Sequence, residues 1–346
     1  MRTTSGYVAD APGAALQRRP LERRALRPDD VSVRVDFCGV CHSDLHALHA
    51  GGSAAFPLVL GHEFVGEVSA IGTDVRTFAV GDPVAVGNIV DSCGACPLCR
   101  AGQENYCVEF PTLTYNGTDR HDGSRTQGGY AREAVVREAF VHHRPPHLDP
   151  AGVAPLMCAG VTVWEPLRAW DVGPGTRLGV VGLGGLGHLA VKLGHALGAE
   201  VTVFTTSAGK AHDARALGAD HVVVSSDGSA MAEQTGRLDL VLDTASAPHD
   251  LGPYLRCLAL DGTLCSLGHL GPVTVETLDL LVGRKRLTSS GSGGRPATQA
   301  LLDFCGEHGI TADVEVLPSA QVQTALERLA RNDVRYRFSL DLSDLD

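Results

Sequence analysis

The sequence predicts an α/β protein built around a doubly wound parallel sheet, joined to a second, mostly β region. Residues 178–207, LGVVGLGGLGHLAVKLGHALGAEVTVFTTS, read as a strand, a glycine turn, a helix and a second strand. Further strand-length apolar runs follow, separated by helix-like stretches such as Ala208–Leu217 and Pro248–Leu258, and this alternation is typical of a parallel sheet. The predicted strands are Leu178–Val181, Val201–Thr205, His221–Ser225, Asp239–Asp243, Gly262–Leu267 and Arg286–Ser290.

The turn after the first of these strands contains the pattern G-x-G-x-x-G, formed by Gly182, Gly184 and Gly187. The first glycine permits a tight turn, the second lets a pyrophosphate approach the backbone, and the third lets helix and strand pack closely. Alone the pattern is weak in a chain with 41 glycines, but here it follows a predicted strand and opens a predicted helix. The sequence therefore predicts dinucleotide binding by Gly182, Gly184, Gly185, Leu186 and Gly187.

Length and composition limit the number of domains, the possible partners and the cellular location. With 346 residues, the chain is long enough for two domains, each with its own core. A formal charge of −11 and the lack of a basic stretch argue against nucleic acid or an anionic membrane as a partner. The N-terminus lacks a signal-peptide pattern and no run of about 18 apolar residues occurs, so a cytoplasmic location is expected. The clustering of the ten cysteines favours metal binding in a reducing compartment over disulfides.

The segment before about Gly52 contains short β-like runs such as Val31–Val35 and leads into FCGVCHSDLH, which contains Cys41. Taken alone, Cys41 fits a small buried apolar residue as well as a ligand. However, His62 follows a glycine between apolar runs, in a position suited to presenting a ligand, and Cys158 lies in PLMCAGVTVWEPL. A Cys/His/Cys set with an open fourth position is the ligand pattern of a catalytic zinc site.

The segment DSCGACPLCRAGQENYC carries four cysteines in the pattern C-x2-C-x2-C-x7-C, namely Cys93, Cys96, Cys99 and Cys107. Four thiolates this close in sequence satisfy tetrahedral zinc with no open position, which is typical of a structural site. An iron–sulfur cluster is the alternative, but no proline follows the last cysteine and no redox-partner motif is present. The four other cysteines, Cys38, Cys257, Cys265 and Cys305, are interpreted as packing residues.

Taken together, GVCHSDLH, GHEFVGEV, the four-cysteine lobe, TYNGTDRHDGSRTQGGYA, PLMCAGVTVWEPL, GLGGLGH and DVRYRF resemble a zinc-dependent alcohol dehydrogenase of the medium-chain dehydrogenase/reductase type. The resemblance is to the cinnamyl-alcohol-dehydrogenase-like branch and covers nearly the whole chain. It implies a Rossmann-type nucleotide-binding domain and a mostly β, GroES-like catalytic domain that carries a structural zinc lobe. We expect the catalytic domain in residues 1–151 and 293–346 and the nucleotide-binding domain in residues 152–292.

The resemblance also implies roles for the residues around Cys41. Cys41, His62 and Cys158 are expected to bind the catalytic zinc, with Glu63 beside it as an outer residue or transient ligand. Asp44 is expected to orient His62 through its far ring nitrogen.

The resemblance further implies roles in proton transfer and in cofactor binding. Ser43 is expected to contact the zinc-bound oxygen and His46 to end the proton relay, through the nicotinamide ribose, to solvent. His42 takes a position that touches the cofactor pyrophosphate in related enzymes. His49 matches nothing in the family and is interpreted as a surface residue.

The end of the strand VTVFTTS indicates which cofactor is used. Domains that bind NAD commonly carry an acidic residue there for the ribose 2′-hydroxyl, whereas this chain has Thr205, Thr206 and Ser207. Lys210 follows, and although a lysine at a helix start can simply be solvated, hydroxyls and a lysine together suit a 2′-phosphate. The sequence therefore predicts NADP(H).

The expected function is zinc-dependent interconversion of a primary alcohol and an aldehyde by a homodimer. An alternative is a reductase of an iminium or activated alkene in a biosynthetic pathway, since this branch can be repurposed. A non-catalytic relative is disfavoured because no ligand or relay residue is missing. Two segments depart from the family pattern: residues 49–57 lack a tryptophan often placed over the substrate, and residues 288–296 are short and rich in glycine and serine. A wider or more mobile pocket is expected.

Overall fold

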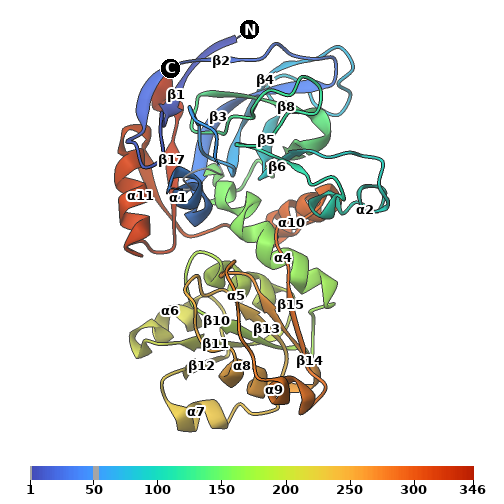
Figure 1. Ribbon diagram of the computed structural model, residues 1–346, viewed down its shortest axis with the longest axis vertical. Helices are drawn as coiled ribbons and strands as arrows, with labels where there is room; N and C mark the ends of the chain where they lie inside the picture. Colours follow the sequence, from blue (N-terminus) through green and yellow to red (C-terminus); the bar gives the residue numbers. More distant parts are fainter. Residues whose placement is uncertain (1, 50–53) are drawn as a thin grey trace. The chain divides into compact units, whose positions relative to one another are not determined.

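The computed structural model describes residues 2–49 and 54–346 (Figure 1). Residues 50–53, within one of the two segments that depart from the family pattern, lie outside the described residues. The chain divides into two compact units, unit 1 with residues 1–158 and 293–346 and unit 2 with residues 159–292. The first boundary follows residue 158 rather than 151, because the turns at 150–157 contact strand β3 (Asp30–Val40) of unit 1.

Unit 1 is mostly β and is built on a seven-stranded sheet with the order β16-β17-β3-β4-β5-β9, in which β8 also pairs with β3. The chain's last strand lies antiparallel to β3, as the red and blue strands of Figure 1 show. Strands β16 and β17 were not among the predicted elements. The strands of this sheet are β3, β4 (Phe64–Ile71), β5 (Pro83–Val86), β8 (Glu133–Arg137), β9 (His142–His143), β16 (Val314–Pro318) and β17 (Arg337–Asp341).

In the described part of unit 1, two short ribbons and five α-helices accompany this sheet, besides short 3-10 turns. The ribbons pair β1 (Arg2–Val8) with β2 (Gln17–Arg23) and β6 (Ile89–Asp91) with β7 (Thr112–Leu113). The helices are α1 (His42–His49), α2 (Pro97–Arg100), α3 (Pro150–Val153), α10 (Arg295–His308) and α11 (Val322–Ala330). Helices α10 and α11 belong to the segment that returns to this unit after residue 292.

The core of unit 1 forms because β3 alternates in DVSVRVDFCGV and places Val31, Val33 and Val35 on one face, where all three are fully buried. Beyond these valines, β3 ends at Val40, directly before Cys41. The well-packed strand β3 thus fixes the position of Cys41, the first predicted metal ligand.

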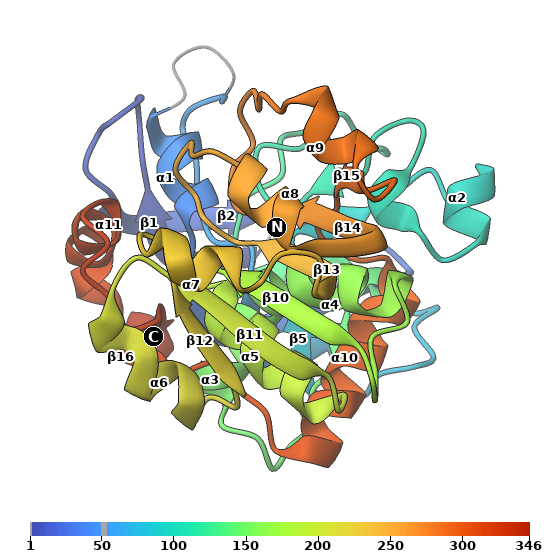
Figure 2. The same ribbon diagram turned by 90° about the horizontal axis from the view of Figure 1, so that it is seen from below.

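Unit 2 is a six-stranded sheet in which every pairing is parallel, with the order β12-β11-β10-β13-β14-β15 (Figure 2). The first strand, β10, lies between β11 and β13, so the strand order reverses there as in a doubly wound fold. The predicted fold class is confirmed. The strands are β10 (Arg177–Val181), β11 (Glu200–Thr205), β12 (His221–Val224), β13 (Leu238–Asp243), β14 (Leu258–Ser266) and β15 (Arg286–Ser289).

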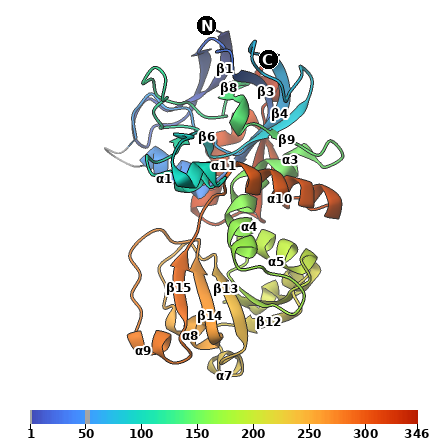
Figure 3. The same cartoon turned by 90° about the vertical axis from the view of Figure 1, so that its right-hand side faces the viewer.

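Helices connect these strands, and α5 packs against β10 and β11. Figure 3 shows α5 beside the sheet of this unit. The predicted helix at Pro248–Leu258 begins only at Gly252, whose N–H is held by the side chain of Asp250. The helices are α4 (Ala159–Ala169), α5 (Gly187–Ala196), α6 (Ala211–Ala216), α7 (Gly228–Ala232), α8 (Gly252–Cys257) and α9 (Thr277–Leu281). Within residues 2–49 and 54–346, no helix has the length and apolar character needed to cross a membrane.

Candidate active site

Asp44 organises the predicted catalytic site of unit 1. It lies in the first turn of α1, is completely buried, and accepts four hydrogen bonds. Its Oδ2 accepts from the backbone N–H of Cys41 at 2.9 Å and from the hydroxyl of Tyr130 at 3.0 Å. Its Oδ1 accepts from the N–H of Gly61 at 3.2 Å and lies 3.1 Å from Nδ1 of His62. This carboxylate therefore fixes the chain on both sides of the site.

The structure brings Cys41, His62 and Cys158 together although they are far apart in sequence. Their ligand atoms all lie within 4.8 Å of one another. The sulfurs of Cys41 and Cys158 are 3.8 Å apart, and Nε2 of His62 lies 3.2 Å from the Cys158 sulfur. Because Nδ1–H of His62 donates its hydrogen bond to Asp44, Nε2 is free to act as the ligand atom.

The chemistry of these groups fits a divalent cation. The pKa of the Cys41 thiol is well below its usual value, chiefly through contact with Cys158, while the same contact raises the pKa of Cys158. Two sulfurs this close cannot both ionise unless a cation balances them. Burial alone would lower the pKa of His62, but the Asp44 carboxylate raises it, which makes the imidazole a more basic ligand.

The predicted relay residues lie on α1, directly after Cys41. The hydroxyl of Ser43 is 3.7 Å from the Cys41 sulfur, so it borders the ligand group. Ser43 and His46 are both exposed, three residues apart on one helix, and no direct hydrogen bond joins them within the described part of α1. His42 is half-buried, and burial lowers its pKa.

Glu63 is buried and forms an ion pair with the guanidinium of Arg337, a residue that the sequence did not single out. Arg337 comes from β17, which lies beside β3 in the sheet. Burial alone would lower the pKa of Arg337, but Glu63 and the nearby thiols of Cys41 and Cys158 raise it, so the guanidinium stays charged. The only signal for Arg337 was its place in the closing motif DVRYRF.

Two tyrosines also flank the site. Both lie in the motif TYNGTDRHDGSRTQGGYA, but the sequence did not indicate either of them as a site residue. Tyr130 is completely buried with its hydroxyl on Asp44. The ring of Tyr115 packs edge-on against His62, with ring centroids 5.5 Å apart. The aromatic surroundings restrict water and fix the imidazole plane.

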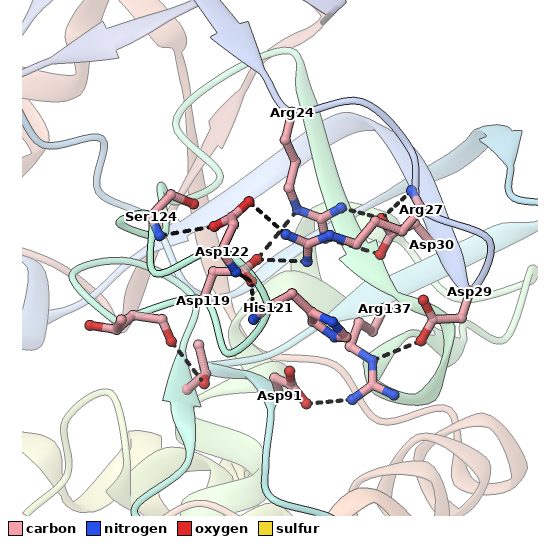
Figure 4. A network of polar contacts seen from close by, with 12 residues as sticks. Arg24, Arg27, Asp29, Asp30, Asp91, Asp119, His121, Asp122, Ser124 and Arg137 are labelled. Atoms are coloured by element: carbon pink, nitrogen blue, oxygen red, sulfur yellow. Dashed lines mark hydrogen bonds and ion pairs between the residues drawn. The ribbon is translucent and has the colours of Figure 1, made fainter.

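The loop between these tyrosines is fastened by ion pairs, seen in Figure 4. Arg27 contacts Asp119 at 2.9 Å and Asp122 at 2.7 Å. Arg24 joins Asp119 to the buried Asp30 of β3. The loop that positions Tyr115 and Tyr130 is therefore tied to the central sheet.

The second cluster, in the lobe around α2, contains the four predicted thiolates. The sulfurs of Cys93, Cys96, Cys99 and Cys107 lie within 4.8 Å of one another, and those of Cys93 and Cys99 are 3.8 Å apart. Four sulfurs bound at about 2.3 Å to one tetrahedral zinc lie about 3.8 Å apart. The spacing therefore suits a single ion. Backbone N–H groups donate to these sulfurs, as from Cys99 to Cys96 at 3.4 Å, which stabilises thiolates.

The lobe is attached to the first turn of α10 by Glu104. This carboxylate is almost completely buried and accepts from Nε of Arg295 at 2.7 Å and from its backbone N–H at 2.9 Å. A side chain at Gly294 would collide with the carbonyl oxygen of Gly102. At least one glycine of the glycine- and serine-rich segment is thus required for packing against the lobe.

The four cysteines outside the clusters are buried in the structure. They are Cys38, Cys257, Cys265 and Cys305.

The glycine turn of unit 2 has the geometry expected for its sequence. Gly182 has φ +87°, a conformation that favours glycine. A side chain at Gly187 would collide with the carbonyl oxygen of Gly182, whereas the space around Gly184 is open. The first glycine therefore makes the turn, the third allows helix and strand to meet, and the second leaves the backbone accessible.

The end of β11 places the predicted cofactor-discriminating residues next to this turn. Thr205 is buried, and its hydroxyl accepts from the N–H of Ser207 at 3.2 Å. Thr206, Ser207 and Lys210 are exposed, and Nζ of Lys210 lies 3.4 Å from the carbonyl oxygen of Leu183 in the turn. The lysine thus reaches the turn from the short helical turn Ala208–Lys210 that follows β11.

Comparison with known proteins agrees with this arrangement. Residues 27–146 match the family described as alcohol dehydrogenase GroES-like domain, and residues 185–307 match the family described as zinc-binding dehydrogenase. The chain is 46% identical to aldehyde reductase YahK of Escherichia coli, with 96% of this chain and 97% of the relative covered. It is 44% identical to NADP-dependent alcohol dehydrogenase C 1 of Mycolicibacterium smegmatis, with 100% and 99% covered.

Among solved structures, a cinnamyl alcohol dehydrogenase of Sorghum bicolor (SbCAD4) superposes with a TM-score of 0.95 and 43% identity, covering 100% of this chain and 99% of that one. The likeness therefore extends over both units. The chain belongs to the zinc-binding, medium-chain alcohol dehydrogenase family, in the cinnamyl-alcohol-dehydrogenase-like branch.

Proposed function

We propose that the protein is a zinc-dependent alcohol dehydrogenase and aldehyde reductase that transfers a hydride between NADP(H) and a primary alcohol or aldehyde. The observation that carries this is the group of Cys41, His62 and Cys158, whose ligand atoms lie within 4.8 Å of one another. Three protein ligands with an open fourth position are the pattern of a catalytic zinc site. The activities in the names of the relatives belong to the same class.

The chain's own residues account for orientation and for the proton. When bound, zinc supplies Lewis-acid polarisation of the substrate oxygen and the nicotinamide supplies the hydride. Asp44 holds His62 in the tautomer that leaves Nε2 as a ligand atom. The Ser43 hydroxyl, beside the ligand group, exchanges the proton of the alcohol oxygen, and exposed His46 passes that proton to solvent. Arg337 balances the charge of Glu63 in the buried wall of the site.

The proposed cofactor is NADP(H). Thr206 and Ser207 offer hydroxyl groups and Lys210 a positive charge where NAD-binding domains commonly carry a carboxylate. The contact of Lys210 with Leu183 supports a position beside the phosphate-binding turn. Hydrogen bonds from charged groups contribute about 1.5–3 kcal/mol each, and NAD has no 2′-phosphate to accept them.

The proposed role of the lobe is structural. Cys93, Cys96, Cys99 and Cys107 would fill all four positions of a second zinc ion, leaving none for substrate. Through Glu104 and Arg295, the metal would stabilise the start of α10. Each subunit would then hold one catalytic and one structural zinc.

We also propose a cytoplasmic homodimer. All ten cysteines are free thiols, which suits a reducing compartment. Helix α9, which precedes the edge strand β15, carries the exposed apolar side chains of Leu278 and Leu281, with 65% and 72% of their surface accessible. Such residues beside a sheet edge favour association with a second copy. Leu281→Asp should shift the protein from dimer to monomer in sedimentation experiments, while Leu270→Asp, exposed outside α9, serves as the control.

The test of the proposed activity is a steady-state comparison of aldehydes, alcohols and imines with NADPH and NADH. We expect aldehyde reduction with NADPH favoured at least about tenfold in kcat/KM, since that needs only about 1.4 kcal/mol of discrimination. Lys210→Ala should raise the KM for NADPH with little change in kcat, because the 2′-phosphate is remote from the transferred hydride. Turnover of imines alone would instead support the iminium reductase.

A matched control is Lys285→Ala, which makes the same charge change in unit 2 just before β15, whereas Lys210 follows β11, and three strands separate β11 from β15 in the sheet. This variant should keep the NADPH preference of the unmodified enzyme. Equal efficiency with both cofactors in the unmodified enzyme would contradict the cofactor assignment but leave the zinc chemistry untouched.

A further inference from the structure

A separate group of potential ligands lies in unit 2 at the carboxyl end of β13. Asp243 ends that strand and borders an open cavity of about 580 Å³ together with His249 and His269. None of the glycine-turn residues 182–187 lines this cavity. Because ligands of such sheets bind outside the carboxyl ends of the strands, the location is suited to a binding site.

Asp243 is buried with half of its carboxylate unused. Only 1% of its side chain is exposed, and Oδ1 accepts from the N–H of Ala245 at 3.2 Å. Oδ2 is buried and has no hydrogen-bond partner among the described residues. Burial raises the pKa of this carboxyl, while the neighbouring His249 acts in the opposite direction. A buried carboxylate oxygen of this kind requires a positively charged or donating partner.

In its neutral form, the imidazole of His249 turns a nitrogen without a proton toward the carboxylate of Asp243. Its Nδ1 lies 3.0 Å from the carbonyl oxygen of Ala247, so the single proton of a neutral imidazole is placed on Nδ1. Nε2 then carries a lone pair and lies 3.4 Å from Oδ1 of Asp243. Two electron-pair donors at this distance need a positive charge between them, either a proton or a metal ion.

The distance suits a metal ion. Two ligand atoms bound at about 2.0–2.1 Å to a tetrahedral zinc lie about 3.3–3.4 Å apart. A histidine whose Nδ1 donates to a backbone carbonyl while Nε2 stays free is also the usual arrangement of an imidazole ligand. The geometry of His249 and Asp243 is thus that of two adjacent ligands.

The charge of the cavity also favours a cation. Its lining contains four carboxylates, from Asp243, Asp250, Glu276 and Asp279, against one arginine, Arg256. Arg256 is engaged with Asp279 at 3.1 Å. The cavity wall is therefore negatively charged, which favours a cation beside the carboxylate and imidazole of Asp243 and His249.

We propose that Asp243 and His249 form a third metal site of this chain, specific for a divalent transition metal, with water molecules as the remaining ligands. It differs from the two sites of the proposed function in having no sulfur ligand.

The test uses the full-length protein loaded with two zinc ions per chain and titrated with Co²⁺. Equilibrium dialysis should find one further equivalent of cobalt, and its absorption should lack a sulfur-to-cobalt charge-transfer band. That band would report exchange of cobalt into either cysteine-containing site. His249→Gln and Asp243→Asn should each weaken binding of the further cobalt by at least about tenfold, as expected for loss of a ligand.

A matched control is His221→Gln, which removes a histidine 3.0 Å from a carboxylate of Glu200 on the exposed surface of the same unit. This variant should bind the further cobalt as the unmodified protein does. Absence of a third equivalent in the unmodified protein, or undiminished binding by His249→Gln, would overturn the proposal and assign the charge between the two side chains to a proton. Because His249 is a quarter exposed, its variant tests the site even where Asp243→Asn does not fold.

Discussion

Nδ1 of His62 donates to Oδ1 of Asp44 at 3.1 Å, and this one hydrogen bond decides which nitrogen of His62 faces the thiols. The same carboxylate holds the backbone N–H groups of Cys41 and Gly61. The position of two of the three predicted ligands thus depends on one buried side chain. An outer carboxylate of this kind typically changes metal affinity by about 10–100-fold.

Asp44→Asn should accordingly accelerate release of the catalytic zinc to a chelator by about 10–100-fold, because the amide carries no charge and cannot accept at all four contacts. The lobe zinc of the same chain should leave at its normal rate and provides an internal reference. Tyr130→Phe is the matched control, since it removes one hydrogen bond to Asp44, worth about 1 kcal/mol of stability, but keeps the carboxylate. Unchanged release of both ions from Asp44→Asn would contradict the assignment.

His46→Gln should lower turnover while both zinc ions stay bound, because His46 is exposed and is not among the grouped ligand atoms. A group that transfers a proton in catalysis typically contributes about 10²–10⁴-fold to the rate, which sets the largest expected loss. His49→Gln, another exposed histidine of α1, is the control and should keep normal turnover. Rates and metal content are measured on the same samples, and a loss of zinc that parallels the loss of activity would require a new ligand set.

Sequence patterns predicted the parts of the protein that depend on local spacing. The glycine turn could be recognised because a strand, three glycines and a helix are adjacent, and φ +87° at Gly182 gives the physical reason for the first of them. The four cysteines of the lobe were recognised for the same reason, since they lie within 15 consecutive residues, 93–107.

Contacts between distant segments could not be predicted in this way. Arg337 and Glu63 are 274 residues apart, and they meet only because β17 pairs with β3. Tyr130 reaches Asp44 across 86 residues. The nucleotide-binding unit begins at residue 159 rather than at the expected residue 152, because the helical turns at 150–157 contact β3 of unit 1. Tertiary contacts decided each of these features.

Cys96→Ser should lower the zinc content from two ions to one per chain and decrease stability before it affects the chemistry. The reason is that three thiolates hold the lobe ion less tightly and its binding energy contributes to folding. Thermal unfolding and metal analysis of one preparation provide the measurements. Cys257→Ser, a buried cysteine outside the clusters whose sulfur contacts the carbonyl of Pro253, should keep both ions. One zinc per chain in fully active unmodified protein would exclude the lobe site.

His142, in strand β9 of unit 1, should make the protein sensitive to mild acid. Burial lowers the pKa of His142 from about 6.5 to about 4, and the charge of Arg295 acts in the same direction. Between these values the unfolded chain binds a proton that the folded chain does not, so stability falls as pH decreases through this window. Well above pH 6.5 the residue is neutral in both states and no longer contributes to the pH dependence.

Between pH 7 and pH 5 this difference corresponds to a loss on the order of 2 kcal/mol in the free energy of unfolding. In His142→Gln, which cannot be protonated, urea unfolding should show a pH-dependent loss smaller by about that amount. Other acid-sensitive groups, including the metal ligands, affect both proteins equally and cancel in the comparison. His143→Gln changes the exposed neighbour in the same strand and should retain the full loss. If both variants lose as much stability as the unmodified protein, the buried imidazole is not the group that responds to pH.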